Sequence, residues 1–173
     1  KRECMSVDAQ AVVVHHQSRD TVVNTVASLI AAGVEARQIL VIDNSPIGDR
    51  PVELANPLVR IVRTSNRGFA AAANLGLGVL WAESVAQSVI VCSHEVVVLP
   101  DTVRNLLAVL ASDERIAAVG PTFYLAGSRR LWSTGGILTR HLHLARHTRN
   151  PVHASNVVDR DWLDGALVEY LDL

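Results

Sequence analysis

This chain has few aromatic residues and no excess of charge of either sign, and each shortage argues against a class of partner. Aromatic residues make up 4% of the 173 residues, so the base-stacking platforms of proteins that bind single-stranded nucleic acid are not expected. A formal net charge of −1 at pH 7 gives no global attraction for a nucleic-acid backbone. We therefore predict no nucleic-acid partner.

Cysteines and long apolar runs are also scarce. The two cysteines, Cys4 and Cys92, are too few for a disulfide framework, and Cys92 lies in a short apolar run that is typical of a buried small side chain. This usage favours a reducing compartment, and we expect the cytoplasm. No run of about 18 apolar residues could span a bilayer, so peripheral association with the inner face of the membrane would use regions outside this chain.

Apolar runs and helical patterns alternate along the chain. With 49% hydrophobic and 19% charged residues, the composition is that of one globular domain with its own core. Short apolar runs predict buried strands at residues 11–14, 39–42, 59–62, 88–92 and 116–119. Helices are predicted from Ser18 or Asp20 to about Gly33, from Phe69, and from Pro100. This alternation favours βαβ units and a mainly parallel sheet, followed by a strand pair at 131–138 and an irregular stretch at 139–160.

Polar side chains follow four of the predicted strands, at residues 15–17, 43–44, 66–68 and 93–95. In an open parallel sheet, ligands bind outside the carboxyl ends of the strands, so we expect these residues to line one crevice. Gly68 lets the backbone come close to a ligand, and the helix that follows offers unpaired N–H groups to an anion. Alone, the turn that begins at Asp43 would indicate only a capped turn.

Six segments carry a more specific pattern: Val12–Ser18, Ile39–Pro46, Asn66–Gly76, Val89–Asp101, Ala118–Pro121 and Asp161–Ala166. In this order they resemble the family 2 inverting glycosyltransferases of the GT-A fold, closest to the bacterial rhamnosyl- and galactofuranosyltransferase branches. The Asn66–Gly76 segment is similar to the family's N-x-G-f-a-a-a-a-N-x-G motif nearly letter for letter. The shared order of motifs over residues 11–173 argues against chance.

The resemblance implies an α/β protein with the GT-A nucleotide-diphospho-sugar transferase fold, a mainly parallel Rossmann-like sheet flanked by helices. We expect a single domain over residues 11–173, with a nucleotide-sugar-binding half at 11–121 and a partial acceptor-side half at 122–173. In the family a further segment precedes the catalytic motif and the chain continues after it, whereas here only Leu167 and Val168 intervene. We therefore expect the fold to be incomplete on its C-terminal side, with residues missing before Glu169 and after Leu173.

The resemblance also implies how a donor is bound. Asp43 would accept hydrogen bonds from the base or ribose of a UDP- or dTDP-sugar, and Arg67 would place positive charge near the diphosphate. The nucleotide-sugar-binding residues implied in this way are His16, Asp43, Asn44, Asn66, Arg67, Gly68, Asn74, Ser93 and His94.

A metal site is implied at Glu95, which occupies the place of the last aspartate in the family's D-x-D element. There Mn²⁺ or Mg²⁺ bridges the diphosphate and offsets charge on the leaving group. Ser93 and His94 replace the other part of that acidic element. Two interpretations remain open: the diphosphate binds the metal, with help from His94 for Mn²⁺, or this is a degenerate GT-A domain that binds nucleotide or glycan without catalysis.

The resemblance also implies an acceptor side, formed by the last residues of this sequence. The acceptor-binding set is Trp162, Asp164 and Gly165, and the catalytic set is Glu169 and Asp172. Glu169 would deprotonate an acceptor hydroxyl so that its oxygen attacks the anomeric carbon opposite the departing nucleoside diphosphate. The alternatives are a packed Trp162 and a solvated C-terminal tail.

The resemblance therefore implies a hexosyltransferase-like enzyme that transfers a sugar with inversion to a cell-envelope glycan or a lipid-linked acceptor. His143 and His147 have the spacing of a helical zinc site, but no cysteine or carboxylate follows, and nearby arginines favour a basic loop facing an anionic acceptor or lipid phosphate. A nucleotidyltransferase would need a Gly-rich loop after the first strand, which residues 15–18 do not supply.

Overall fold

The computed structural model describes residues 6–83, 87–128, 130–133, 136–138 and 145–147. It forms two compact units that divide between Leu107 and Ala108, and each is described by itself. The predicted single domain, with halves that meet at residue 121, stays a prediction. No helix in the described part of the chain is long and apolar enough to cross a membrane.

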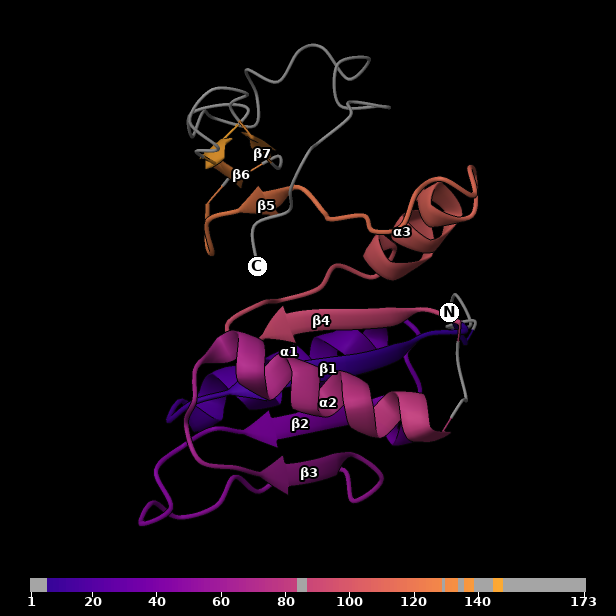
Figure 1. Ribbon diagram of the computed structural model, residues 1–173. Helices are drawn as coiled ribbons and strands as arrows, with labels where there is room; N and C mark the ends of the chain where they lie inside the picture. Colours follow the sequence, from indigo (N-terminus) through magenta and orange to yellow (C-terminus); the bar gives the residue numbers. More distant parts are fainter. Residues whose placement is uncertain (1–5, 84–86, 129, 134–135, 139–144, 148–173) are drawn as a thin grey trace. The chain divides into compact units, whose positions relative to one another are not determined.

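The first unit contains a four-stranded parallel sheet (Figure 1). Its strands are β1 (Gln10–His15), β2 (Ile39–Asp43), β3 (Arg60–Arg63) and β4 (Val89–Ser93). Their order in the sheet is β3-β2-β1-β4. The chain therefore moves outward from β1 through β2 to β3 and then returns to the other side of β1. Such a reversal of strand order is where open α/β sheets place their ligands.

Helices cover both faces of this sheet, with α1 (Arg19–Ala31) on one face and α2 (Phe69–Glu83) on the other (Figure 1). Successive side chains of a strand point to opposite faces, so Ala11 and Val13 pack in the α1 core while Val12 and Val14 pack in the α2 core. The continuous burial of β1 and β2 is the pattern expected of a sheet covered on both sides. The α1 core also receives Val103, from α3 (Thr102–Leu110).

The ends of α1 confirm one half of the prediction made for that helix. Ser18 occupies the N-cap position, but its side chain makes no capping hydrogen bond. At the other end, the Gly33 N–H donates to the Ile30 carbonyl at 3.0 Å and the Val34 N–H donates to the Leu29 carbonyl at 3.1 Å. These two bonds form the Schellman ending that Gly33 predicts. The short 3₁₀ helix η1 (Ala36–Gln38) then leads into β2.

Gly76 sets the distance between α2 and the sheet. A Cβ at this position would lie 2.5 Å from Cγ1 of Val12 and 3.2 Å from Cγ1 of Ile42. Only a hydrogen fits there, so the last glycine of the Asn66–Gly76 segment is explained by close packing of the helix on β1 and β2.

The second unit corrects two predictions about strands. Residues 116–119 form no strand, because none of the described strands pairs with them. Residues 131–138 do contain two strands, β6 (Leu131–Ser133) and β7 (Gly136–Leu138), but these do not pair with each other. Instead β6 pairs antiparallel with β5 (Phe123–Tyr124), and β7 pairs antiparallel with β8 (Ala145–His147), inside the stretch predicted to be irregular.

Candidate functional site

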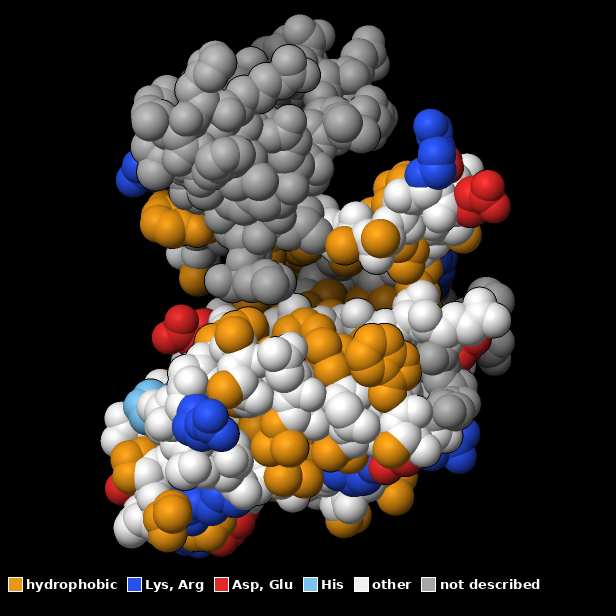
Figure 2. Space-filling view, viewed as in Figure 1, with side chains coloured by type: hydrophobic (Ala, Val, Ile, Leu, Met, Phe, Trp, Pro, Cys, Tyr) orange, Lys and Arg blue, Asp and Glu red, His pale blue; other side chains and the backbone are white. Residues whose placement is uncertain are grey.

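The carboxyl ends of β1 to β4 bring most of the predicted donor-binding residues to one edge of the sheet. The register pairs His15 with Asp43, Asp43 with Arg63, and Val14 with Ser93. In the space-filling view this edge shows a histidine and Lys or Arg side chains, whereas hydrophobic side chains gather over α2 (Figure 2). We call residues 43–45, with the loops that contact them, the β2 end, and residues 93–95 the β4 end.

Asp43 is buried at the β2 end, with 1% of its surface exposed. Its Oδ1 accepts the backbone N–H of Ser45 at 3.0 Å, while Oδ2 has no hydrogen-bond partner among the described residues and lies 3.9 Å from Nε of Arg63. Burial by itself raises the pKa of this carboxyl, but the hydrogen bonds from Ser45, together with the nearby His15 and the backbone of Val52, lower the pKa below its ordinary value. Asp43 therefore stays ionised, with one oxygen still able to accept.

His15 belongs to residues 15–17, which were expected to line the crevice, but it was not among the predicted nucleotide-sugar-binding residues. The side chain is 2% exposed, and its Nε2 lies 4.0 Å from Oδ1 of Asp43. The His94 ring packs against it edge to face, with centroids 5.1 Å apart. Burial lowers the pKa of His15 and outweighs the opposing effect of Asp43, so the imidazole is neutral at pH 7. The sequence signal for a role of His15 at the site is its position as a polar residue at the end of a continuously apolar run.

Hydrogen bonds join the loop after β1 to the loop after β2. His16 Nδ1 lies 3.1 Å from the Asn44 carbonyl, and the Gln17 backbone N–H donates to Oγ of Ser45 at 2.9 Å. The Gln17 side chain donates to Oδ2 of Asp49 at 3.2 Å. Arg63, which none of the sequence predictions named, donates from Nη2 to the carbonyl oxygens of residues 46 and 49. The loop after β2 is thus held from both neighbouring strands.

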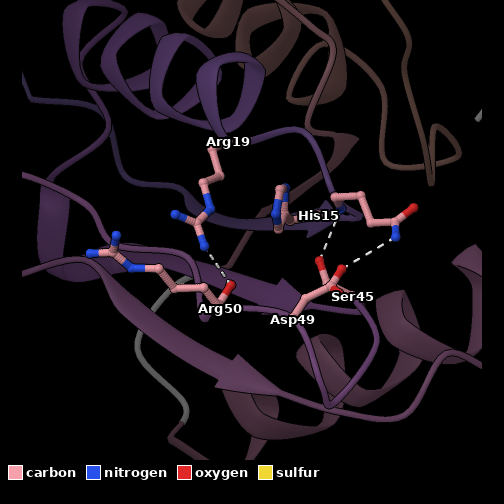
Figure 3. A pocket seen from close by; sticks show the side chains of 6 residues that line it. His15, Arg19, Ser45, Asp49 and Arg50 are labelled. Carbon is pink, nitrogen blue, oxygen red and sulfur yellow. Dashed lines mark hydrogen bonds between the residues drawn. The ribbon is translucent and has the colours of Figure 1, made fainter.

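A cavity of about 180 Å³ opens between these two loops (Figure 3). It is lined by His15, Gln17, Arg19, Ser45, Asp49 and Arg50. In the close-up, His15 stands between Arg19 and Ser45, and the Arg19 guanidinium donates to the Arg50 carbonyl at 2.8 Å. The cavity therefore offers both donors and acceptors beside the buried pair of His15 and Asp43.

Asn66 organises the turn that precedes α2. Its Oδ1 accepts the backbone N–H of Gly68 at 2.9 Å and the side-chain amide of Asn44 at 3.0 Å. Gly68 has a φ of +90°, a conformation that a side chain disfavours. The predicted residues Asn44, Asn66 and Gly68 therefore form one connected group that joins the ends of β2 and β3.

The other two donor-binding residues predicted near α2 are exposed. Arg67 lines a second cavity, of about 160 Å³, together with residues 64–65, 71–72 and 75. Asn74 lies exposed on α2 and makes no hydrogen bond to another predicted site residue in the described part of the chain. The structure thus leaves Asn74 apart from the connected group.

The β4 end is tied to β1 through His94. Its backbone N–H donates to the Val14 carbonyl at 3.0 Å, and its ring Nδ1 lies 3.1 Å from the same oxygen. When Nδ1 donates to that carbonyl, Nε2 keeps the lone pair that a metal would need. Glu95 is exposed. Within the described ranges no three His, Cys, Asp or Glu side chains are grouped so that they could hold a metal ion.

The comparison with protein families now identifies the chain. The sequence model described as Glycosyl transferase family 2 matches residues 11–161. The chain belongs to glycosyl transferase family 2. Comparison with curated proteins and with solved structures gives no match. Family 2 membership assigns the GT-A fold, confirming that prediction, and supports glycosyl transfer in general, from a nucleotide-sugar donor to a glycan acceptor.

Because family 2 members commonly use divalent metals, we ask whether the side chains at the β4 end could hold a divalent cation. One imidazole nitrogen from His94 and one carboxylate from Glu95 are available. This pair suits Mn²⁺ or Mg²⁺ only if the ion takes most of its ligands from phosphate oxygens and water, as Mg²⁺ commonly does. The residues present therefore fit a cation that arrives with the donor diphosphate.

The predicted acceptor-binding and catalytic residues lie outside the described residues. They are Trp162, Asp164, Gly165, Glu169 and Asp172. His141 and His143, considered for zinc, lie outside as well.

Proposed function

We propose that this family 2 glycosyltransferase transfers a sugar, with inversion, from a UDP- or dTDP-sugar to a cell-envelope glycan or a lipid-linked acceptor. The rhamnosyl- and galactofuranosyltransferase branches are the expected type. The observation that carries the proposal is the family match over residues 11–161, together with polar residues at the ends of all four strands. Such a crevice is where an open α/β sheet binds its ligand.

The donor is proposed to bind along the edge from the β2 end to the β4 end. The ionised Asp43, with Oδ2 unpaired among the described residues, would accept from the nucleoside. Arg67 is exposed beside α2 and would supply positive charge toward the diphosphate. A cation held by Glu95 and His94 would offset negative charge on the diphosphate as the sugar departs.

The transfer is proposed to use Glu169 as the general base, with Asp172 in the same motif. The carboxylate would take the proton of an acceptor hydroxyl while that oxygen forms a bond to the anomeric carbon. The bond from this carbon to the diphosphate oxygen breaks on the opposite side, so the configuration inverts and the nucleoside diphosphate leaves. Trp162, Asp164 and Gly165 would hold the acceptor.

Nucleotide-dependent thermal stabilisation tests the donor half of this proposal. A ligand that binds only the folded state stabilises it by RT ln(1 + [L]/Kd), about 2.7 kcal/mol at one hundred times Kd. UDP- and dTDP-sugars should raise the melting temperature more than GDP-sugars, and Mn²⁺ should increase the shift. No shift with any nucleotide would count against the proposal.

Transfer and donor hydrolysis test the catalytic half. Glu169→Gln should abolish transfer while leaving the nucleotide-induced thermal shift unchanged, and Glu95→Ala should reduce activity in proportion to its loss of the Mn²⁺ effect. Wild-type protein that binds nucleotide selectively but turns over no donor with any acceptor would instead support a degenerate, binding-only GT-A domain.

A further inference from the structure

One residue on the buried face of α1 is polar, although the others are apolar. The buried residues of this helix are Val22, Thr25, Val26 and Leu29, and Thr25 is completely buried. Valine has nearly the same shape as threonine, so packing alone does not require a hydroxyl at this position. Because a buried hydroxyl costs free energy unless it makes a hydrogen bond, the bond that Thr25 makes has to explain its presence.

The Thr25 hydroxyl connects α1 to the β4 end. Its Oγ1 donates to the His94 carbonyl at 2.7 Å, the usual length of an O–H···O bond, and lies 3.1 Å from the Thr21 carbonyl of its own helix. A threonine inside a helix ordinarily bonds back to a carbonyl of the preceding turn. Here the shorter contact leaves the helix and holds the backbone of the residue that follows β4.

Ser28, one turn further along α1, contacts the same loop at a second point. Its hydroxyl donates to the Thr25 carbonyl at 2.8 Å, and its oxygen accepts the backbone N–H of Val98 at 3.0 Å. The Val98 side chain also packs against the α1 core. We call residues 94–98 the β4 loop. Thr25 and Ser28 therefore hold the first and the last residue of the β4 loop.

The middle of the β4 loop is exposed, and it carries Glu95. Its first residue, His94, is also held from β1, because both its backbone N–H and its ring contact the Val14 carbonyl. The protein offers a cation one imidazole nitrogen and one carboxylate on consecutive residues, so the backbone at residues 94 and 95 sets where the two ligands can meet. A backbone that is fixed beforehand reduces the ordering that binding must supply.

We propose that Thr25 and Ser28 are positioning residues of the transfer reaction, which hold the β4 loop so that His94 and Glu95 can contact the cation that arrives with the donor diphosphate. This inference rests on the proposed function, because it takes His94 and Glu95 as the ligands. Both hydroxyls act through the backbone of the loop and not on the donor itself.

Hydrogen exchange tests the two contacts in the protein without nucleotide or metal. Thr25→Val keeps the shape of the side chain and removes the hydroxyl. The amides of His94 and Val98 should then exchange about fivefold faster, the change expected for the loss of one hydrogen bond. Ser28→Ala should accelerate the Val98 amide by a similar factor. Thr25→Ser, which keeps the hydroxyl, should exchange as the wild type does.

Binding of UDP tests whether these contacts serve the site. The quantity measured by calorimetry is the ratio of the Kd of UDP without Mn²⁺ to the Kd with Mn²⁺. Loss of a residue that orients a metal ligand weakens metal binding about ten- to a hundredfold, and Thr25 acts only through the backbone. In Thr25→Val the ratio should therefore fall by up to about tenfold, while the Kd without metal stays unchanged. Thr25→Ser should restore the ratio. Ser28→Ala should also lower it, and this variant carries the test if Thr25→Val does not purify as a folded protein.

Thr21→Val is the matched control, because the Thr21 hydroxyl donates to the Ser18 carbonyl at 2.8 Å, on the same helix but away from the β4 loop. It should leave the exchange of the loop amides and the Mn²⁺ ratio as in wild type. Faster exchange with an unchanged ratio in Thr25→Val and Ser28→Ala, or an equal loss of UDP affinity with and without Mn²⁺, would overturn the positioning role alone. Wild-type protein that binds no UDP, or that binds it without a Mn²⁺ effect, would instead contradict the proposed function.

Discussion

The β2 end and the β4 end lie on the same edge of the sheet, but they differ in how far the protein's own contacts hold their polar side chains. At the β2 end, Asp43 is buried and Asn44 is hydrogen-bonded to Asn66. At the β4 end, His94 is held against β1 through one carbonyl, and Glu95 is exposed. The first is organised by the protein itself, whereas the second has too few ligands to hold a cation without the donor. Nucleoside recognition should therefore not depend on metal. Any increase in nucleotide affinity on adding Mn²⁺ should come from the β4 end alone.

Asp43→Asn should produce the largest effect on binding. Asparagine keeps an Oδ1 that can accept from Ser45, so the turn is retained, but the ionised acceptor is lost. A hydrogen bond to a charged group contributes about 1.5–3 kcal/mol, which predicts a Kd for UDP weaker by about tenfold to a hundredfold with or without Mn²⁺. Isothermal calorimetry measures this. If Asp43→Asn weakened UDP binding only in the presence of Mn²⁺, nucleoside recognition at the β2 end would depend on metal, and the proposed difference between the two ends would be wrong.

Glu95→Gln is the counterpart at the β4 end. Without metal its Kd for UDP should equal that of wild type, and the gain in affinity on adding Mn²⁺ should shrink. The same titrations check this, with Mg²⁺ as a second ion. Equal affinities with and without metal in wild type would argue against a metal role for Glu95.

Two glycines of α2 test how closely that helix is packed on the sheet beneath the site. Gly76→Ala would place a Cβ 2.5 Å from a Val12 methyl group, and such overpacking costs about 1–3 kcal/mol. A Cβ at Gly78 would meet nothing within 4 Å, so Gly78→Ala should stabilise by up to about 1 kcal/mol through helix propensity. Urea unfolding of the two variants should give changes in opposite directions. Equal effects would contradict the close approach at Gly76.

Asn66→Ala tests the connected group at the β2 end. It removes the acceptor for both the Gly68 N–H and the buried amide of Asn44. Leaving one buried group unpaired costs about 1–3 kcal/mol, less where the amide keeps its second contact, to the Gly68 carbonyl at 3.5 Å. The free energy of unfolding should therefore decrease by an amount in the lower part of that range. Asn74→Ala, on the exposed surface of the same region, is the control that should leave stability nearly unchanged.

Much of the first unit could be predicted, because its strands and helices have clear local sequence patterns. The runs at 11–14 and 39–42 are apolar without interruption and are buried on both faces. The run at 116–119 has the same appearance but pairs with no described strand. A short apolar run does not reveal whether a partner strand is present, and local patterns contain no information on pairing.

The site was predictable where sequence order alone brings residues to strand ends. Asp43 ends β2 and Asn66 lies in the loop that follows β3, so parallel topology is enough to place them at the same edge of the sheet. His15 and Arg63 depend on more: the register of β1 and β3 against β2, and the loop after β2 that packs over their side chains. Whether His15 belongs to the strand or to the loop is decided by that packing, and for this reason only the structure reveals it as a buried residue.

The pH dependence of stability should separate the two buried groups of the β2 end, with the smallest of the expected effects. The pKa of His15 is lowered, so the unfolded chain binds its proton more readily, and stability falls as pH drops below about 6.5 toward the folded pKa. The pKa of Asp43 is also lowered, so its contribution is present above about pH 4 and is lost as pH falls through its folded pKa. Urea unfolding between pH 3 and pH 8 should show both limbs. His15→Phe should reduce the loss of stability below about pH 6.5 and leave the loss below about pH 4 unchanged. Asp43→Asn should reduce only the loss below about pH 4. A variant in which both losses disappear would mean that the two groups titrate as one unit.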